Sequence, residues 1–379
     1  MHKKYWYLFT SIFIIIWSDF INFKMCFKNY FIFIKYNLIG DMMKKLDKTL
    51  FICVTLLCFF GLLMVYSSSS IWADYKFGDS FHYLKYQFIF FIIGFFLMIF
   101  VSKIDVSIYY KYANVLLFGS FILLILVLIP GIGSVRNGSR SWFGIGSLGI
   151  QPSEAAKISL IIFTSKYLSR SNDFIDSYFK GLFPILGVTC ICFGLIMLQP
   201  DLGTGVIIFM SIISILFIAG VSMKFFMAGG VIGLIGVIGL IVIAPYRMSR
   251  ITAFIDPWKD ELGSGFQMIQ SLYAIGPGGV LGTGFLNSIQ KHFYLPEPQT
   301  DFIFSIICEE FGVVGCLIVI LLFGVLFYRG VKIALNCHDL FSKYLTFGIL
   351  FQLLFQAVLN LCVVVGLIPV TGVVLRGIL

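Results

Sequence analysis

The sequence predicts an all-α, polytopic membrane protein, and three observations lead to that class. Of the 379 residues, 59% are hydrophobic and only 12% are charged. Soluble domains carry about 25% charged and about 45–50% apolar residues, so this composition excludes a water-soluble enzyme. Disorder is excluded as well, because disordered chains have few apolar residues and many charges. Finally, apolar runs long enough to span a bilayer recur along the chain, with short polar segments between them.

Nine apolar runs predict nine spanning helices, because backbone that faces lipid must form its hydrogen bonds within a helix. The expected helices cover residues 49–66, 87–102, 113–131, 153–168, 182–198, 203–219, 224–245, 302–327 and 344–366. With the Met42 end inside, Lys and Arg are more frequent in the inner loops than in the outer ones. This bias favours that orientation of the chain in the membrane.

Residues 42–379 form the predicted membrane domain, and residues 1–41 stand apart from it. Met42–Lys48 has the composition of a cytoplasmic start before a first spanning helix. Residues 1–41 are therefore expected to be an atypical N-terminal extension. The alternative is one extra hydrophobic segment around Tyr7–Trp17.

The segment 246–301 is much longer than the other connections and lies outside the membrane in the expected orientation. Loops longer than about 12–15 residues are usually functional or disordered. This loop is dense in aromatic residues, Gly and Pro. We therefore expect a folded outer cap, partly embedded in the membrane, rather than a linker.

The net charge of +9 would fit a nucleic-acid partner in a soluble chain. In a membrane protein, inner-loop Lys and Arg and contacts with anionic lipid explain it, so no nucleic-acid partner is expected. The cysteines lie mostly within apolar runs without a CxxC pair, which predicts no metal site. No cofactor follows from these residues, and a divalent cation (Mg²⁺ or Mn²⁺) stays open.

Four polar stretches interrupt the apolar pattern, and the first precedes the fourth predicted helix. It comprises Asn137–Phe143, which includes Arg140, and then Ile150–Lys157. Ser153 suits a helix cap and Glu154 the positive end of the helix, which leaves Lys157 about one turn inside the membrane. Charges there are costly and usually functional. The alternative is a lysine that reaches the surface and pairs with Glu154.

The second polar stretch is a turn, and the third carries two arginines. Gln199–Thr204 is a tight turn with Asp201 as an expected helix cap, and structure alone would explain it. The third stretch begins with Arg247–Arg250 and continues to a Gly-rich run that ends at Gly284. Arginine grips phosphate with two parallel hydrogen bonds, so these side chains favour an anionic ligand.

The fourth stretch, Tyr294–Phe304, carries the strongest candidate for chemistry. Asp301 lies where the outer loop enters an apolar helix. Burial disfavours the charged carboxylate and raises its pKa towards the range of a general base. The alternative is an N-cap for a helix that begins at Phe302, and the two roles are compatible.

In their order along residues 47–375, these motifs resemble the SEDS family (shape, elongation, division and sporulation), which includes RodA, FtsW and SpoVE. The stretch Tyr294–Asp301 is more similar to the FtsW/SpoVE branch than to the RodA branch. The matching stretches are Ser67–Ser70, Asn137–Arg140 with Trp142, Gln151–Glu154, Gln199–Gly203, Asp256–Trp258, Gln270–Leu272, Leu295–Glu297 and Thr300–Ile303.

The resemblance implies a ten-helix peptidoglycan glycosyltransferase of division or sporulation septum synthesis. Such an enzyme polymerises lipid II on the outer face of the bacterial cytoplasmic membrane. The implied partners are a class B penicillin-binding protein transpeptidase and other divisome proteins. The family's essential carboxylate falls on Asp301, and its functional lysine falls on Lys157.

The expected substrate contacts extend this assignment. Arg140, Arg247 and Lys157 are the candidate cations for the pyrophosphate of lipid II. Glu297 and Gln270 lie in matching motifs and complete the candidate substrate-binding set.

The chain also departs from the family pattern. Asp260 is followed by Glu261 where members of the branch often carry Asp-Pro, and Gly149 stands where some members carry an arginine. The sequence ends at Leu379, shortly after Thr371–Val373, without the stretch that leads into a tenth helix. We therefore expect nine helices of the family's ten, with a truncated C-terminal helix.

Two other functions fit the same residues. A lipid II flippase would use the same basic cavity without chemistry, and a non-catalytic scaffold would hold and activate a transpeptidase. Transport has no need of a base at Asp301, so this residue separates the flippase from the enzyme.

Overall fold

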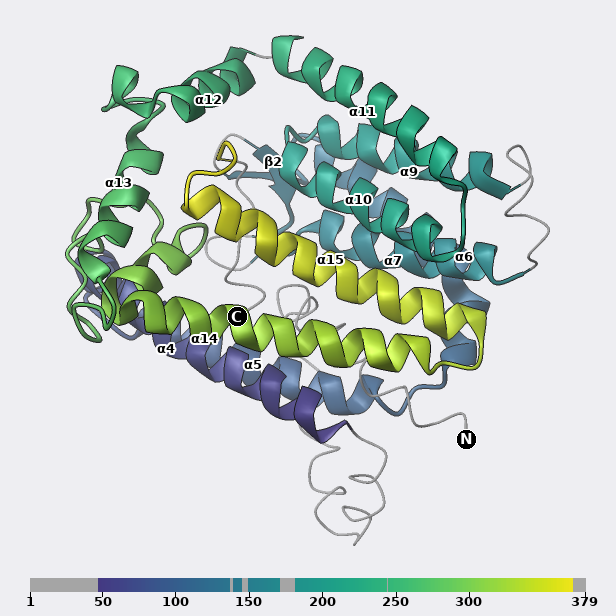
Figure 1. Cartoon of the computed structure of the whole chain (residues 1–379), viewed down its shortest axis with the longest axis horizontal. Helices are drawn as coiled ribbons and strands as arrows, with labels where there is room; N and C mark the ends of the chain where they lie inside the picture. The colour runs from purple at the N-terminus through teal and green to yellow at the C-terminus, as the bar shows by residue number, and fades with distance from the viewer. Residues whose placement is uncertain (1–46, 137–138, 145–148, 171–180, 244, 371–379) are drawn as a thin grey trace, which may run out of the picture.

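The computed structural model describes residues 47–136, 139–144, 149–170, 181–243 and 245–370 (Figure 1). The extension expected over residues 1–41 and the C-terminal stretch from residue 371 lie outside the described residues. Within the described residues, each of the nine predicted helices is present. They are α4 (Lys48–Phe77), α5 (His82–Val101), α6 (Val106–Leu128), α7 (Pro152–Leu168), α9 (Phe183–Met197), α10 (Leu202–Ile218), α11 (Met223–Ile243), α14 (Ile303–Leu335) and α15 (Leu340–Val364).

Six of these helices are long and apolar enough to cross a membrane by length and composition: α4, α5, α6, α11, α14 and α15. The helices α7, α9 and α10 have 15–17 residues and complete the bundle. The core is built from buried aliphatic side chains of α4, α6, α7, α10, α14 and α15. The chain is thus a multi-pass, all-helical membrane protein, as the composition predicts.

Aspartates cap several of these helices, which explains where they begin. The side chains of Asp47, Asp105, Asp201 and Asp339 accept a backbone N–H from the first turn of α4, α6, α10 and α15, at 2.8–3.0 Å. A cap of this kind satisfies an N–H that has no partner within the helix. The predicted cap at Asp201 is confirmed.

Two local predictions were wrong. The first helix does not close at Ser67–Ser70 but continues to Phe77. The hydroxyls of Ser68, Ser69 and Ser70 donate to carbonyls one turn back, such as Ser69 to Val65 at 2.6 Å. Ser153 is not the cap of α7. Gln151 occupies that position and Pro152 follows it, so Ser153 lies buried within the helix.

The expected outer cap is folded. It contains α12 (Pro245–Ile255), a 3₁₀ turn at Pro257–Asp260, α13 (Phe266–Ile275) and a second 3₁₀ turn at Gly276–Gly278. This segment lies at the left end of Figure 1, where α14 begins. Before α7, a short antiparallel hairpin forms from β1 (Ser134–Arg136) and β2 (Ser139–Trp142).

Helix α14 is interrupted at Gly312, whose backbone (φ 59°, ψ −154°) is not helical. The outer cap fills this break. Val313 N–H donates to the Gly279 carbonyl at 3.0 Å, and Thr283 N–H donates to the Glu309 carbonyl at 2.9 Å. The backbone groups released by the break are therefore satisfied by protein.

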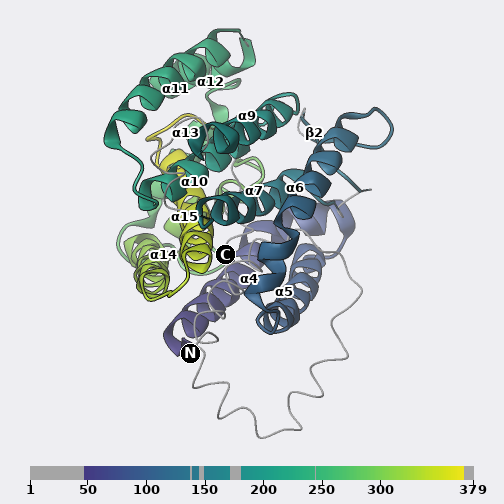
Figure 2. The ribbon, with the colours of Figure 1, turned by 90° about the vertical axis from the view of Figure 1, so that its right-hand side faces the viewer.

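Helix α11 differs from the rest of the bundle. None of its residues is buried against the described part of the chain. Figures 1 and 2 both place it at the outer edge of the bundle, next to α12. A helix that is apolar on all sides and has so few protein neighbours is suited to lipid.

Candidate active site

Asp301 lies where the outer cap enters α14. The Asn360 amide on α15 donates to its backbone carbonyl at 2.8 Å, which fixes the main chain there. The N-cap of α14 is Phe302, without a side-chain cap, so the capping role considered for Asp301 was wrong. The Asp301 carboxylate makes no hydrogen bond to any residue that the structure describes.

Charged neighbours and burial set the proton affinity of this carboxylate. Burial raises the pKa of Asp301 to about 6, the nearby carboxylates of Glu297 and Asp201 also raise it, and Arg250 lowers it. A base with a pKa close to the working pH is efficient, because it is largely deprotonated and still binds a proton well. The expected burial of Asp301 and the raised pKa of its carboxylate agree with this environment, and its role as a base stays a prediction.

Two polar stretches that are distant in sequence meet beside this position. Ser139 in β2 donates to the Gln199 carbonyl, which ties the hairpin to the turn before α10. The Gln151 amide donates to Asp201 at 3.2 Å. Asp201 is itself one of the charges that act on Asp301. The hairpin, the start of α7 and the start of α10 therefore converge towards the candidate base.

The two arginines of α12 have different roles. Arg247 donates to the Leu240 carbonyl and to the Tyr246 hydroxyl, each at 2.8 Å. Arg250 donates to the Val370 carbonyl at 3.1 Å and is the cation that acts on Asp301. The sequence predicted Arg247 as the substrate contact and left Arg250 out, because the spacing alone does not reveal which of the two approaches the carboxylate.

Lys157 is enclosed in the bundle and only 2% exposed. Its ammonium group lies 2.7 Å from Glu154 and donates to the Gln356 amide oxygen on α15 at 3.1 Å. The predicted pair with Glu154 is confirmed, but the lysine does not reach the surface. It is not among the charges that act on Asp301. Its role as a substrate contact stays a prediction.

The other candidates are placed but not tested. Arg140 lies in β2, opposite Val135 of β1, and is half-buried. Gln270 is half-buried on α13, next to Ser271, which hydrogen-bonds to Ser305 and to the Val364 carbonyl at 2.8 Å. Among the described residues, no three His, Cys, Asp or Glu side chains gather closely enough to hold a metal ion.

A multi-pass helical bundle with a partly desolvated aspartate at the entry of a helix defines a membrane protein with a candidate general base. The chain belongs to the family of FtsW, RodA and SpoVE, whose description is cell cycle protein and whose model matches residues 47–377. The family predicted from the motifs is confirmed.

Individual relatives agree with this assignment. Stage V sporulation protein E of Bacillus subtilis is 50% identical over 87% of this chain and 90% of its own. A probable peptidoglycan glycosyltransferase FtsW of Saccharophagus degradans is 39% identical over 88% and 87% of the two chains.

Solved structures share the fold. One comes from work on the structural coordination of polymerization and crosslinking by a peptidoglycan synthase complex. It has a TM-score of 0.71 and 30% identity, and the match covers 86% of this chain and 90% of that one. The crystal structure of the rod shape determining protein RodA of Thermus thermophilus has a TM-score of 0.60 and 26% identity, over 86% and 87%.

Proposed function

We propose that the chain is a peptidoglycan glycosyltransferase that polymerises lipid II on the outer face of the bacterial cytoplasmic membrane. The observation that carries this proposal is Asp301, a carboxylate with a pKa raised to about 6 and no hydrogen-bond partner among the described residues. The names of the FtsW relatives support the same reaction class. The excess of Lys and Arg in the loops opposite the cap supports the outward orientation.

The reaction joins two lipid-linked disaccharides. Asp301 takes the proton from the 4-hydroxyl of the acceptor N-acetylglucosamine, and the hydroxyl oxygen forms a bond to the anomeric carbon of the donor. The bond from that carbon to the pyrophosphate oxygen breaks, and the pyrophosphate leaves with the electron pair. Because attack is direct, the donor linkage is inverted. Arg250, together with Arg140, Arg247 and Lys157, supplies the cations for the departing charge.

The proposal is tested with the purified chain in lipid vesicles that contain lipid II. We expect glycan polymer on a gel, and the assay is run with Mg²⁺, with Mn²⁺ and with a chelator, because a divalent cation stays a proposed cofactor. Movement of lipid II across the bilayer without polymer would support a flippase instead. Stimulation of a transpeptidase without polymer would support a scaffold.

The proposed partner is a class B penicillin-binding protein transpeptidase, together with other divisome proteins. One of the solved structures with this fold belongs to a complex that coordinates polymerization and crosslinking. A polymerase in such a complex would deliver new strands directly to the crosslinking enzyme. Co-purification from membranes with a tagged transpeptidase checks this proposal.

The pH dependence of the reaction should follow the charges around Asp301. The rate is expected to rise with pH through about 6, because only the deprotonated carboxylate accepts a proton. Glu297→Gln removes a charge that raises the pKa, so the acidic limb should move to lower pH. Arg250→Gln removes the charge that lowers it, so the limb should move to higher pH. Profiles of kcat/KM from about pH 4 to about pH 8 measure both shifts, and shifts of equal sign would contradict the assignment.

Lys157 should contribute to binding lipid II. Lys157→Met leaves the half-buried Glu154 without its cation, which lowers stability, so the matched variant is Lys157→Met with Glu154→Gln. The double variant is expected to fold but to bind lipid II more weakly by about 1.5–3 kcal/mol, or about ten- to a hundredfold. Binding to lipid II in detergent measures the loss. Parental affinity in the double variant would show that the lysine is structural.

A further inference from the structure

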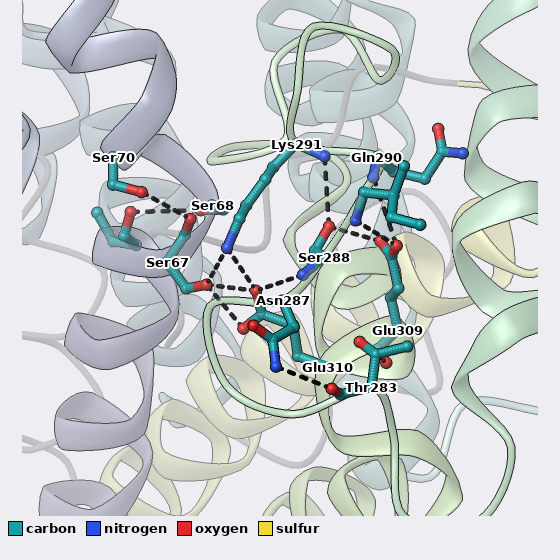
Figure 3. A network of polar contacts seen from close by, with 12 residues as sticks. Ser67, Ser68, Ser70, Thr283, Asn287, Ser288, Gln290, Lys291, Glu309 and Glu310 are labelled. Carbon is teal, nitrogen blue, oxygen red and sulfur yellow. Dashed lines mark hydrogen bonds and ion pairs between the residues drawn. The ribbon is translucent and has the colours of Figure 1, made fainter.

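A buried ion pair joins the outer cap to two helices of the bundle (Figure 3). The Lys291 ammonium group lies 2.9 Å from a Glu310 carboxylate oxygen, and both side chains are at most 2% exposed. Ser67 on α4 donates to the same carboxylate, with its hydroxyl 2.5 and 2.7 Å from the two oxygens. Lys291 also donates to the Ser67 hydroxyl at 3.3 Å. The outer cap, α14 and α4 therefore meet at one carboxylate.

The neighbouring carboxylate holds the same stretch of the cap. Glu309 accepts from the Ser288 hydroxyl at 2.5 Å and from the backbone N–H groups of Ile289 at 2.6 Å and Gln290 at 3.4 Å. Figure 3 shows Ser288 and Gln290 beside the Glu309 carboxylate. We call Ser67, Ser288, Lys291, Glu309 and Glu310 the anchor network.

Because of the break in α14, Glu309 and Glu310 hold the outer cap by their main chain as well as by their side chains. Because Gly312 interrupts the helix, the carbonyls of Glu309 and Glu310 are released, and they accept from the N–H groups of Thr283 and Gly284 at 2.9 and 3.0 Å. The same two residues thus hold one part of the cap by their main chain and the next part by their side chains. Residues 283–291 have little freedom to shift along α14.

The chain between the anchor network and Asp301 is short and folded back on itself. The Leu295 N–H donates to the Gln290 carbonyl at 3.0 Å, and the Leu295 side chain is only 2% exposed. The Thr300 N–H donates to the Glu297 carbonyl at 3.1 Å. These hydrogen bonds and the buried Leu295 side chain connect residues 288–291 to the stretch that carries Glu297 and Asp301.

Stability alone does not account for the network. A well-packed apolar cluster of similar volume is often at least as stable as a buried ion pair, because both ions must leave water. A buried pair does, however, allow only one arrangement of its partners, since every other arrangement leaves a charge unpaired. The Lys291–Glu310 pair therefore fixes one arrangement of the outer cap on α14, close to where the cap leads into the candidate site.

We infer that Lys291 and Glu310, with Ser67 and Glu309, are positioning residues that hold Asp301 over the acceptor hydroxyl. They act through residues 288–301 and touch no substrate atom themselves. This role rests on the proposed function of Asp301 as the base. It goes beyond that function by assigning the geometry of the base to an ion pair between the cap and the bundle.

The test variant is Lys291→Met with Glu310→Gln, which removes both charges of the ion pair together and leaves Glu309 with the hydrogen bonds it has in the parent. We expect kcat to fall about ten- to a hundredfold, because a misplacement of about 1 Å has an effect of that size. KM should change less than about twofold, since the binding cations stay in place. Hydrogen exchange of the amides of residues 288–301 should become faster in the full chain.

Two further variants separate positioning from folding. Ser67→Ala removes one hydroxyl from the network and should lower kcat less than the double variant does. Lys291→Arg keeps the charge and should retain most of the parental kcat. The matched control is Lys85→Met with Asp79→Asn, which removes an exposed ion pair of 2.7 Å at the start of α5 and should leave kcat and exchange at parental values.

The outcomes are distinct. Parental kcat together with faster exchange overturns the positioning role, and so does unchanged exchange in the double variant. A rise in KM with unchanged kcat overturns it as well, because the network would then serve binding. A parent chain that makes no polymer overturns the proposed function, and this role with it. The positioning role is overturned on its own only if the parent chain makes polymer and the double variant gives one of the contrary results.

Discussion

Asp301→Asn is expected to abolish glycan polymerisation while the chain stays folded. Asparagine has the same size but does not accept a proton, and the loss of a general base typically lowers the rate about 10²–10⁴-fold. The substitution removes no helix cap, because Phe302 occupies the N-cap of α14. It also breaks no hydrogen bond of the carboxylate to a described residue. The measurement is the polymerisation rate in vesicles, with the melting temperature as the check on folding.

The matched control for this variant is Glu261→Gln, which neutralises an exposed carboxylate of the same outer cap. It should polymerise at the parental rate. A transpeptidase should bind both variants equally well, since neither substitution changes the bundle surface. If Asp301→Asn made polymer at the parental rate, Asp301 would not be the base, and the enzyme would need another.

Gly282→Ala is expected to detach the outer cap from α14. Gly282 has φ of 81°, and an added Cβ would lie 2.1 Å from the Glu310 carbonyl oxygen. The strained backbone costs about 1–3 kcal/mol, and each buried carbonyl that loses its donor costs about 1–3 kcal/mol more. We therefore expect a lower melting temperature, a lower level in membranes and very little polymerisation.

The control for Gly282→Ala is Gly236→Ala in α11. Nothing lies within 4 Å of a Cβ built at Gly236, and alanine is a better helix former than glycine, so its stability should be equal or higher. If both variants lost the same amount of stability, the loss would not come from the close contact between Gly282 and the Glu310 carbonyl. That result would contradict the role given to Gly282.

The helices were predictable because the bilayer demands long apolar runs, and each of the nine runs became a helix. Their ends were less predictable. Four serines in a row look like a helix terminus, yet the hydroxyls of Ser68–Ser70 bond to the preceding turn, Ser67 donates to Glu310, and the helix continues. Hydrophobicity also gave no sign of the break at Gly312. Its cause is a contact with Gly279–Gly282, which lie about thirty residues earlier in the sequence.

The candidate base was predictable from its place between a polar segment and an apolar helix, but its neighbours were not. Arg250 is one helical turn from Arg247, and only the fold shows which of them approaches Asp301. The anchor network was missed because its members are single polar residues in separate stretches, and their partners lie far away in the sequence. Ser67 and Glu310 are 243 residues apart, and no pattern within either stretch reveals that the serine hydroxyl donates to the carboxylate.

The break at Gly312 also has a consequence for how the chain enters the bilayer. The part of α14 before the break is enclosed by protein, from Ile303 to Glu310, whereas the part from Val313 onwards has faces exposed to lipid. An acidic residue in the middle of an inserting helix costs about 2.5–3.5 kcal/mol.

The second part carries no acidic residue, and at about 1.5 Å per residue it is about 35 Å long, enough to cross the hydrocarbon layer of about 30 Å alone. It can therefore insert during synthesis while Glu309 and Glu310 stay outside the bilayer. In the folded chain these two carboxylates are buried and have partners in residues 288–291. We therefore expect Asp301 to reach its final position after the membrane span has inserted, as a late event in biogenesis.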